Sequence, residues 1–134
     1  MTRMPVRSYA TGTADGPVLV LTGPLSFWGG IDATSGRVID RSHPDLGSRV
    51  TGTILVMPGG RGSSSSSSVL AETLRRGTGP AGILLANPDP ILTVGALVAE
   101  SLYGIRCPIV VGAIDALRTG IRVRIDDGWL TVIA

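Results

Sequence analysis

Six consecutive serines, Ser63 to Ser68, follow a glycine-rich segment in the string MPGGRGSSSSSSVL. A serine hydroxyl is a weak base unless its alkoxide is stabilised, and the glycines at 59, 60 and 62 would let the backbone approach a ligand closely. Gly/Ser tracts are also typical of flexible linkers, which is the alternative interpretation. A linker should separate domains, whereas this run joins a predicted buried strand to a predicted helix within 134 residues. We therefore predict an ordered loop wrapped around a helix N-terminus.

The N-terminus of a helix presents unpaired backbone N–H groups and the positive end of the helix dipole. An anionic substrate group would be held there, and the same environment would stabilise an alkoxide. Other loop motifs fit less well. The P-loop needs a lysine, which the chain lacks, the dinucleotide fingerprint needs a third glycine where Ser65 stands, and the G-x-S-x-G motif of serine hydrolases is absent.

Short strands must position this loop. Apolar and β-branched residues predict strands in five segments: Arg3 to Tyr9, Val18 to Leu21, Val50 to Met57, Ala81 to Ala86 and Ile109 to Val111. The third of these segments leads directly into the glycines and serines. The sequence therefore predicts a strand, loop and helix unit at the centre of the chain.

Two helices are predicted between the strands. Helix formers in VLAETLRR follow the serines and end at Gly77. Asp89 supplies an N-cap and Pro90 a first residue for a second helix that runs to about Tyr103. Because this second helix is apolar on nearly every side, we expect it to be buried between a sheet and another structure.

The remaining segments predict loops and a hairpin. Thr22 to Gly47 is rich in glycine, proline, aspartate and serine, which indicates an ordered loop with one short strand at Arg37 to Asp40. Near the end, apolar residues alternate with arginines from Ile121 to Ile125. The turn Asp126-Asp127-Gly128 and the segment Trp129 to Ile133 follow, which predicts a hairpin at the sheet's edge. Together the elements predict a mixed α/β fold with about two main helices.

The composition excludes several classes of protein. Hydrophobic residues make up 43% of the chain and charged residues 16%, which is far from a disordered chain and leaves apolar surface for a partner. The twelve arginines are scattered along the chain, and ten acidic residues nearly balance their charge. We therefore expect no nucleic-acid binding. The chain has no apolar run of about 18 residues and no secretory core, so we expect a cytoplasmic protein without membrane contact.

Other candidate residues have simpler roles. The single cysteine, Cys107, cannot hold an iron–sulfur cluster by itself and is interpreted as a small buried side chain. The single histidine, His43, lies in a Ser-His-Pro-Asp turn and is expected to be solvated or structural. Asp32 is expected to cap a turn, and Arg122 and Arg124 to face solvent or a partner.

Three strings occur in this order between about Leu25 and Val110: LSFWGGIDATSGRVID, MPGGRGSSSSSSVL and GILLANPDPILTVGALVAE. They resemble the motifs of the aconitase X small subunit, or swivel domain. The resemblance implies one swivelling β/β/α domain over residues 1–134, which closes over an active site on a large subunit. It also implies an iron–sulfur cluster in that large subunit, with no metal or cofactor bound by this chain.

The same resemblance implies roles for individual residues. In this family the serine directly after G-x-G is the proton acceptor, which is Ser63 here. The G-R-G-S-S portion is also similar to the G-S-S-R loop of ordinary aconitase, but here no arginine follows the serines, and Arg61 precedes them. Trp28 either walls the substrate pocket or anchors its own loop. The residues expected to bind substrate are Gly60, Arg61, Gly62, Ser64, Ser65 and Trp28.

The branches that the chain resembles dehydrate cis-3-hydroxy-L-proline or 5-phosphomevalonate. Because the SFWGGID string is more similar to the hydroxyproline branch, we favour a hydro-lyase that forms 1-pyrroline-2-carboxylate with its large subunit. A metal acting as Lewis acid would let the substrate hydroxyl leave as water. Phosphomevalonate dehydration is the alternative reaction. Two further alternatives are a stand-alone anion-binding or regulatory module and a structural domain whose serines only cap the helix.

Overall fold

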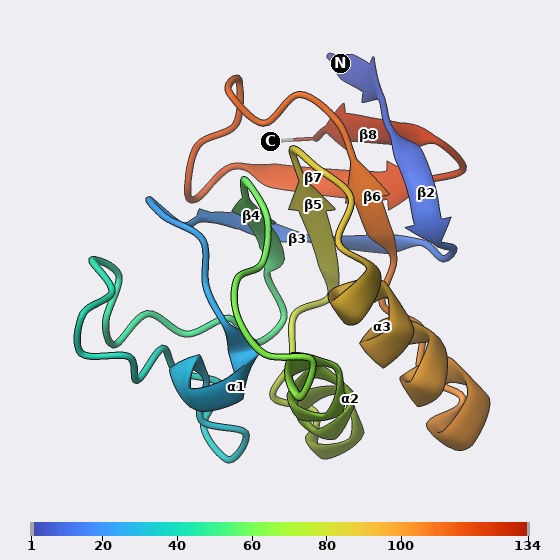
Figure 1. The fold of residues 1–134 in the computed structure, drawn as a ribbon. Helices are drawn as coiled ribbons and strands as arrows, with labels where there is room; N and C mark the ends of the chain where they lie inside the picture. Colours follow the sequence, from blue (N-terminus) through green and yellow to red (C-terminus); the bar gives the residue numbers. More distant parts are fainter. Residues whose placement is uncertain (1, 134) are drawn as a thin grey trace.

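The computed structural model describes residues 2–133 as eight strands and three helical segments. The strands are β1 (Arg3–Pro5), β2 (Arg7–Ala10), β3 (Ala14–Val20), β4 (Ile54–Met57), β5 (Gly82–Leu85), β6 (Ile109–Val111), β7 (Arg122–Asp126) and β8 (Trp129–Val132). The helical segments are α1 (Phe27–Gly30), α2 (Ser66–Arg76) and α3 (Pro90–Tyr103). Figure 1 shows α2 and α3 side by side below the strands.

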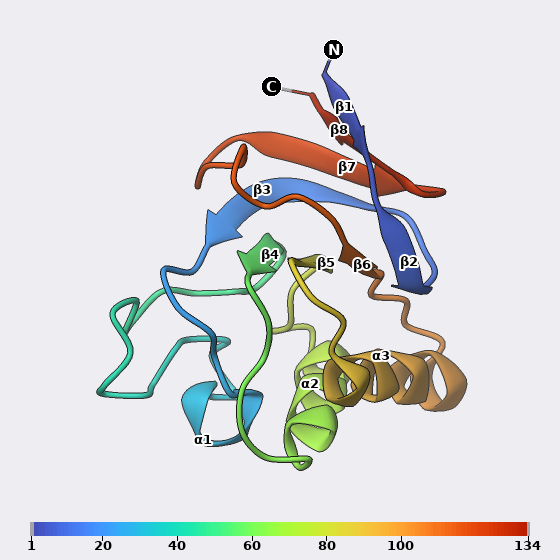
Figure 2. The same cartoon turned by 45° about the horizontal axis from the view of Figure 1, so that its top comes forward.

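The strands form one strongly curved sheet in the order β1-β8-β7-β3-β4-β5-β6-β2. Strand β3 joins its two halves: Ala14 to Pro17 pair antiparallel with β7, and Val18 to Val20 pair parallel with β4. Figure 2 shows β1, β8 and β7 as one layer, β4 to β6 as a second, and the helices as a third. The predicted β/β/α architecture, with mixed α/β structure and two main helices, is confirmed.

Alternating side chains of the central strands build a core on each side of the middle layer. Leu55 and Met57 belong to the cluster beneath α2 and α3, whereas Ile54 and Val56 belong to the cluster beneath the β7–β8 hairpin. All four residues of β4 are fully buried. Burial on both faces explains why this strand is a continuous apolar run, as expected of a parallel strand covered on both sides.

Three predicted strands differ from the structure. The segment Arg3 to Tyr9, predicted as one strand, forms two, β1 and β2, which pair with β8 and β6 at opposite edges of the sheet. Strand β4 begins at Ile54 and not at Val50, because Gly52 adopts a φ of +69° and Thr53 N–H bonds back to the Val50 carbonyl at 3.1 Å. The segment Arg37 to Asp40 forms only isolated bridges, Arg37 with Arg49 and Val38 with Ile31. The preceding segment α1, which the sequence did not predict, is one irregular turn interrupted by non-helical dihedral angles at Trp28 and Gly29.

The hairpin at the end of the chain forms as predicted, but its placement at the sheet's edge is wrong. Strand β1 pairs with β8 on the outer side, with Met4 opposite Leu130, so β1 is the edge strand. Arg122 and Arg124 are exposed, as predicted, and their guanidinium groups lie 3.7 and 3.6 Å from the Asp15 carboxylate.

The two main helices follow the sequence signals closely. Helix α2 takes in the last three serines and ends at Gly77, which adopts a left-handed φ of +76°. Helix α3 begins at Pro90 and ends at Gly104, as predicted. Only one face of α3 is buried within this chain, and the described residues do not provide the second structure that was expected to cover the helix. None of the helices within residues 2–133 has the length and hydropathy that a membrane span requires.

Candidate active site

The glycine–serine loop lies at the start of α2 and connects this helix to β4. Ser63 precedes the first helical residue, Ser66, by three positions and is half-buried. The Ser63 carbonyl accepts the Ser66 N–H at 3.0 Å, so the chain turns tightly into the helix. The run is therefore an ordered loop at a helix N-terminus, as predicted, and not a linker.

The Ser63 hydroxyl accepts one backbone N–H and lies in a loop that, in the described part of the chain, contains several unpaired ones. Its Oγ accepts the Ser65 N–H at 3.0 Å. Gly62 adopts a φ of +92°, which L-residues rarely adopt, and this reverses the chain just before the serines. Within residues 2–133, the N–H groups of Gly62, Ser63 and Ser64 find no acceptor. Successive free N–H groups of this kind, at the positive end of a helix of 11 residues, favour negative charge.

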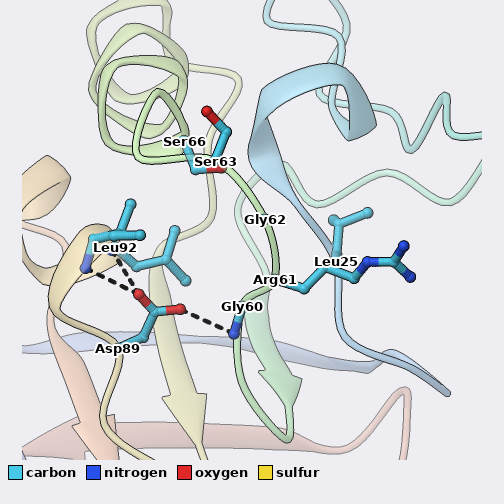
Figure 3. A pocket seen from close by; sticks show the side chains of 9 residues that line it. Leu25, Gly60, Arg61, Gly62, Ser63, Ser66, Asp89 and Leu92 are labelled. Atoms are coloured by element: carbon cyan, nitrogen blue, oxygen red, sulfur yellow. Dashed lines mark hydrogen bonds between the residues drawn. The ribbon is translucent and has the colours of Figure 1, made fainter.

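A half-open cavity of about 90 Å³ lies beside this loop. Figure 3 shows Ser63 and Ser66 at the start of α2, with Gly60 to Gly62 leading from them towards Asp89. The cavity is lined by Leu25, Gly60, Arg61, Gly62, Ser63, Ser66, Asp89, Ile91 and Leu92. Its size suits one small polar group of a ligand, because a water molecule occupies about 30 Å³ in the liquid.

Asp89 connects the loop to the start of α3. Its Oδ1 accepts the N–H groups of Ile91 and Leu92 at 3.0 and 3.1 Å, which caps α3 as predicted. Its Oδ2 accepts the Gly60 N–H at 3.0 Å. A side chain at Gly60 would collide with this carboxylate, so the glycine is required by the close approach.

Ser66 connects the loop to α1. Its hydroxyl accepts the Trp28 N–H at 3.1 Å and lies 3.2 Å from the Ser26 hydroxyl. The side chain itself is almost fully buried, at 4% exposure. The indole of Trp28, by contrast, is 58% exposed and does not line the cavity. The backbone of Trp28 anchors its loop, and its ring extends into solvent beside the site.

The structure brings together some of the predicted substrate contacts and separates others. Gly60, Arg61 and Gly62 line the cavity with Ser63. Ser64 instead lines a neighbouring hollow of about 220 Å³ with Ser67, Pro90, Ile91 and Val94. Ser65 is exposed, and it contributes its backbone N–H to Ser63.

The exposed guanidinium of Arg61 lies within electrostatic range of Asp40. The pKa of Asp40 is lowered, chiefly by hydrogen bonds from Ser42 and in part by the charge of Arg61. Figure 3 shows the Arg61 side chain extending away from Asp89. Arg61 is thus a residue of the cavity wall whose charged end extends away from Asp89.

His43 and Asp32 are structural. His43 is 7% exposed, so of the two expected roles, solvated or structural, the structural one applies. A tautomer with the proton on Nε2 satisfies its bonds to the Gly23 carbonyl at 3.2 Å and from the Asp45 N–H at 3.0 Å. Asp32 caps its turn as predicted, because its carboxylate accepts the Ser35 hydroxyl and the Thr34 N–H, and these bonds lower its pKa.

The residues that the structure describes do not fit a metal centre. Within 2–133, no group of three or more His, Cys, Asp and Glu side chains is placed to hold a metal ion. Cys107 is buried, as predicted, and burial raises the pKa of its thiol to about 12. Its Sγ lies 3.7 Å from the Pro80 carbonyl, which leaves it poorly suited to bind iron as a thiolate.

Sequence reasoning missed several residues of the cavity. Ser66 was part of the serine run but was not separated from its neighbours, and Asp89 was interpreted only as a helix cap. Leu25, Ile91 and Leu92 form the apolar part of the wall. The two prolines that flank Asp89 were the signal that fixed its position, but nothing in the sequence placed it opposite Gly60.

Comparisons with known proteins identify the family of this chain. Residues 3–132 match the family described as Aconitase X swivel domain. The chain is 50% identical over 103 residues to a cis-3-hydroxy-L-proline dehydratase of Pseudomonas aeruginosa; the match covers 77% of this chain but only 18% of that protein's length. It is 38% identical over 131 residues to a phosphomevalonate dehydratase small subunit of Pyrococcus furiosus, covering 96% of this chain and 93% of the relative.

A solved structure has the same fold. The crystal structure of Thermococcus kodakaraensis aconitase X in its holo-form superposes with a TM-score of 0.91 and 31% identity, covering all of both chains.

Proposed function

The chain belongs to the aconitase X swivel domain family, and from this premise we propose that it is the serine-bearing small subunit of a dehydratase, with Ser63 as proton acceptor. One observation carries the proposal. The Ser63 hydroxyl stands on a cavity wall, accepts the Ser65 N–H at 3.0 Å and lies at the positive end of α2. A hydroxyl in this environment is the group of the chain that is best suited to become a base.

The physical argument concerns the stability of the alkoxide. Hydrogen bonds donated to a charged oxygen and a nearby helix N-terminus both favour its ionised form, and therefore lower the pKa of the hydroxyl. Exclusion of water by a closing partner would strengthen both interactions. Ser63 would then remove the proton from the carbon next to the substrate carboxylate, while the partner assists the departing hydroxyl.

We assign cis-3-hydroxy-L-proline as the substrate. Loss of the C2 proton and the C3 hydroxyl leaves a C2=C3 double bond and releases one water, and the resulting enamine tautomerises to 1-pyrroline-2-carboxylate. The 50% identity over 103 residues to the Pseudomonas enzyme supports this assignment; a phosphomevalonate dehydratase small subunit of Methanopyrus kandleri is 49% identical over a shorter stretch of 83 residues. The free N–H groups of Gly62 and Ser64 are the groups that would hold an anionic part of the substrate.

The exposed ring of Trp28 would contribute to the substrate site only once a partner covers it. The iron–sulfur cluster is assigned to the large subunit, because the lone buried cysteine of this chain is a poor ligand.

Dehydration of 5-phosphomevalonate is the second candidate. The share of each relative's length that the match covers favours this candidate. The match covers 93% of the Pyrococcus small subunit but only about a fifth of the Pseudomonas hydroxyproline enzyme. Both candidates use the same serine and the same proton abstraction. They differ in the anionic group that the N–H groups must hold.

The test is a substrate comparison on the assembled enzyme. The chain is co-purified with the aconitase X large subunit of the same organism and incubated with each substrate in D₂O, with product formation followed by proton NMR. We expect 1-pyrroline-2-carboxylate from cis-3-hydroxy-L-proline and no turnover by the isolated chain. If the complex dehydrates only 5-phosphomevalonate, the assignment of cis-3-hydroxy-L-proline as substrate is wrong. If the assembled complex dehydrates neither compound, the proposed function is wrong.

A further inference from the structure

The outward face of α3 is unusually apolar for a surface helix. Five apolar side chains of this face, Ile91, Val94, Leu97, Val98 and Leu102, are called the α3 stripe; each lies three or four residues from another member. Four of them are well exposed: Val94 50%, Leu97 46%, Val98 37% and Leu102 68%. The opposite side of the helix, with Leu92, Gly95, Ala96 and Ala99, is buried against the protein. Figures 1 and 2 show α3 at the outside of the helical layer, with α2 on one side of it.

The stripe carries no charge. Glu100 is the one charged residue of α3, and it pairs with Arg106 at 3.1 Å. A helix that faces water normally shows polar residues on that side, whereas α3 is apolar on both sides. Contiguous exposed apolar surface of this kind marks an interaction site in a soluble protein.

The stripe is continuous with the Ser63 cavity. Ile91 lines both the cavity beside Ser63 and the neighbouring hollow, which contains Ser64 and Val94. A polypeptide that closes over Ser63 must therefore approach the first turn of α3. A stable interface engages about 20–30 residues on each side, so it would extend from the cavity rim along the helix.

We propose that the α3 stripe is the docking surface for the large subunit of the dehydratase, an inference that rests on the proposed function. The large subunit must contact the Ser63 rim to present substrate there, and the stripe is the apolar surface that adjoins this rim. A second copy of this chain on the same face would cover Ile91 and Val94 and so obstruct the approach to Ser63.

The test measures assembly and not turnover. Leu97→Glu and Val98→Glu place a charge on exposed helical positions, so the isolated variants should keep the melting temperature of the wild type. Trp129→Glu is the matched control, because Trp129 is an exposed apolar side chain at 39% on β8, in the layer farthest from α3. Affinity for the large subunit is measured by sedimentation velocity over a concentration series.

We expect the two α3 variants to raise Kd at least about tenfold, the effect of losing roughly 1.4 kcal/mol, and Trp129→Glu to leave it unchanged. An unchanged Kd in both α3 variants would overturn the docking surface. A different result is that the wild type self-associates and that Leu97→Glu abolishes this without changing the affinity for the large subunit. That result would assign the stripe to a homodimer and would also overturn the proposed docking surface. A complex that assembles but dehydrates neither substrate would count against the proposed function alone.

Discussion

The carboxylate of Asp89 accepts the backbone N–H of Gly60 at 3.0 Å, across 29 residues of sequence. Because the same carboxylate caps α3, the start of that helix and the loop that carries Ser63 are held by one side chain. Asp89 therefore fixes the loop that carries Ser63, and under the proposed function it is a positioning residue for that serine. It acts through the backbone of the loop, and its own three hydrogen bonds leave its charge well satisfied.

Asp89→Asn should separate these two contributions. The amide oxygen can still cap α3, since Asn is a good N-cap, but the amide N–H₂ would face the Gly60 N–H and leave it without an acceptor. We expect kcat of the assembled enzyme to fall at least about tenfold with KM little changed, because misplacement of a reacting group affects the chemical step. Asp32→Asn is the control, since Asp32 caps a turn away from the cavity. A loss of stability in both variants with equal kcat would contradict the positioning role.

Ser63→Ala should abolish turnover while leaving the fold intact. Removal of a general base costs about 10²- to 10⁴-fold in rate. The structural cost should be no more than about 1 kcal/mol, because only the bond from the Ser65 N–H is lost, at an exposed position. Turnover and chemical denaturation are measured on the same preparation, with the exposed Ser68→Ala as control. A fully active Ser63→Ala enzyme would leave the serine with a capping role only.

Gly95→Ala should destabilise the protein although alanine is the better helix former. The exchange alone favours the helix by about 1 kcal/mol. The new Cβ, however, would lie 2.6 Å from the Ser67 carbonyl oxygen and 3.1 Å from the Ser67 Cα, so α3 and α2 must move apart. We expect a lower melting temperature by calorimetry. Gly23→Ala is the control, since its Cβ would meet nothing within 4 Å, and an equal or higher melting temperature for Gly95→Ala would contradict the steric argument.

Cys107 should be inert in the folded protein. Burial raises its pKa from 9.0 to about 12, so the folded chain keeps the proton over a range in which the unfolded chain releases it. The resulting contribution to stability is present below pH 9.0 and is lost as the pH rises from there to about 12. The wild type should therefore lose more stability than Cys107→Ala in denaturation curves recorded between pH 8 and 11.

The same variant tests the metal assignment. If the large subunit alone holds the cluster, the complex of Cys107→Ala should keep the iron content and turnover of the wild type. Loss of iron in this complex, measured by elemental analysis, would make Cys107 a ligand.

Local signals in the sequence predicted the helices more accurately than the strands. Asp89, Pro90 and Gly104 fixed both ends of α3, because caps are short-range interactions between neighbouring residues. The apolar run from Val50 predicted a strand four residues too early, since nothing local shows that Gly52 turns the chain. The pairing of β1 outside β8 depends on residues more than a hundred positions apart, so the sheet's true edge could not be read from the hairpin itself.

The part of the candidate site that is local in sequence was predicted, and the part that depends on long-range contacts was not. The loop Gly60 to Ser65 is contiguous in sequence, and its glycine and serine composition was sufficient to identify it. The partners that hold it in place come from elsewhere: Leu25, Ser26 and Asp89 meet it only through the fold. Trp28 was a reasonable candidate from its neighbours, but the turn at α1 directs its ring outwards.

The pairing of Arg3 with Thr131 has a consequence for how this fold can be built into larger proteins. Strands β1 and β8 lie together in the layer farthest from the helices, and the serine loop lies on the helical side (Figure 2). Because the outer ends of these two strands are adjacent, linkers attached to them would start close together. A larger polypeptide could therefore contain this domain as an insertion with two short linkers. Such an insertion would leave the serine loop on the side away from the joining segments, and in one relative the matched segment makes up only 18% of the length.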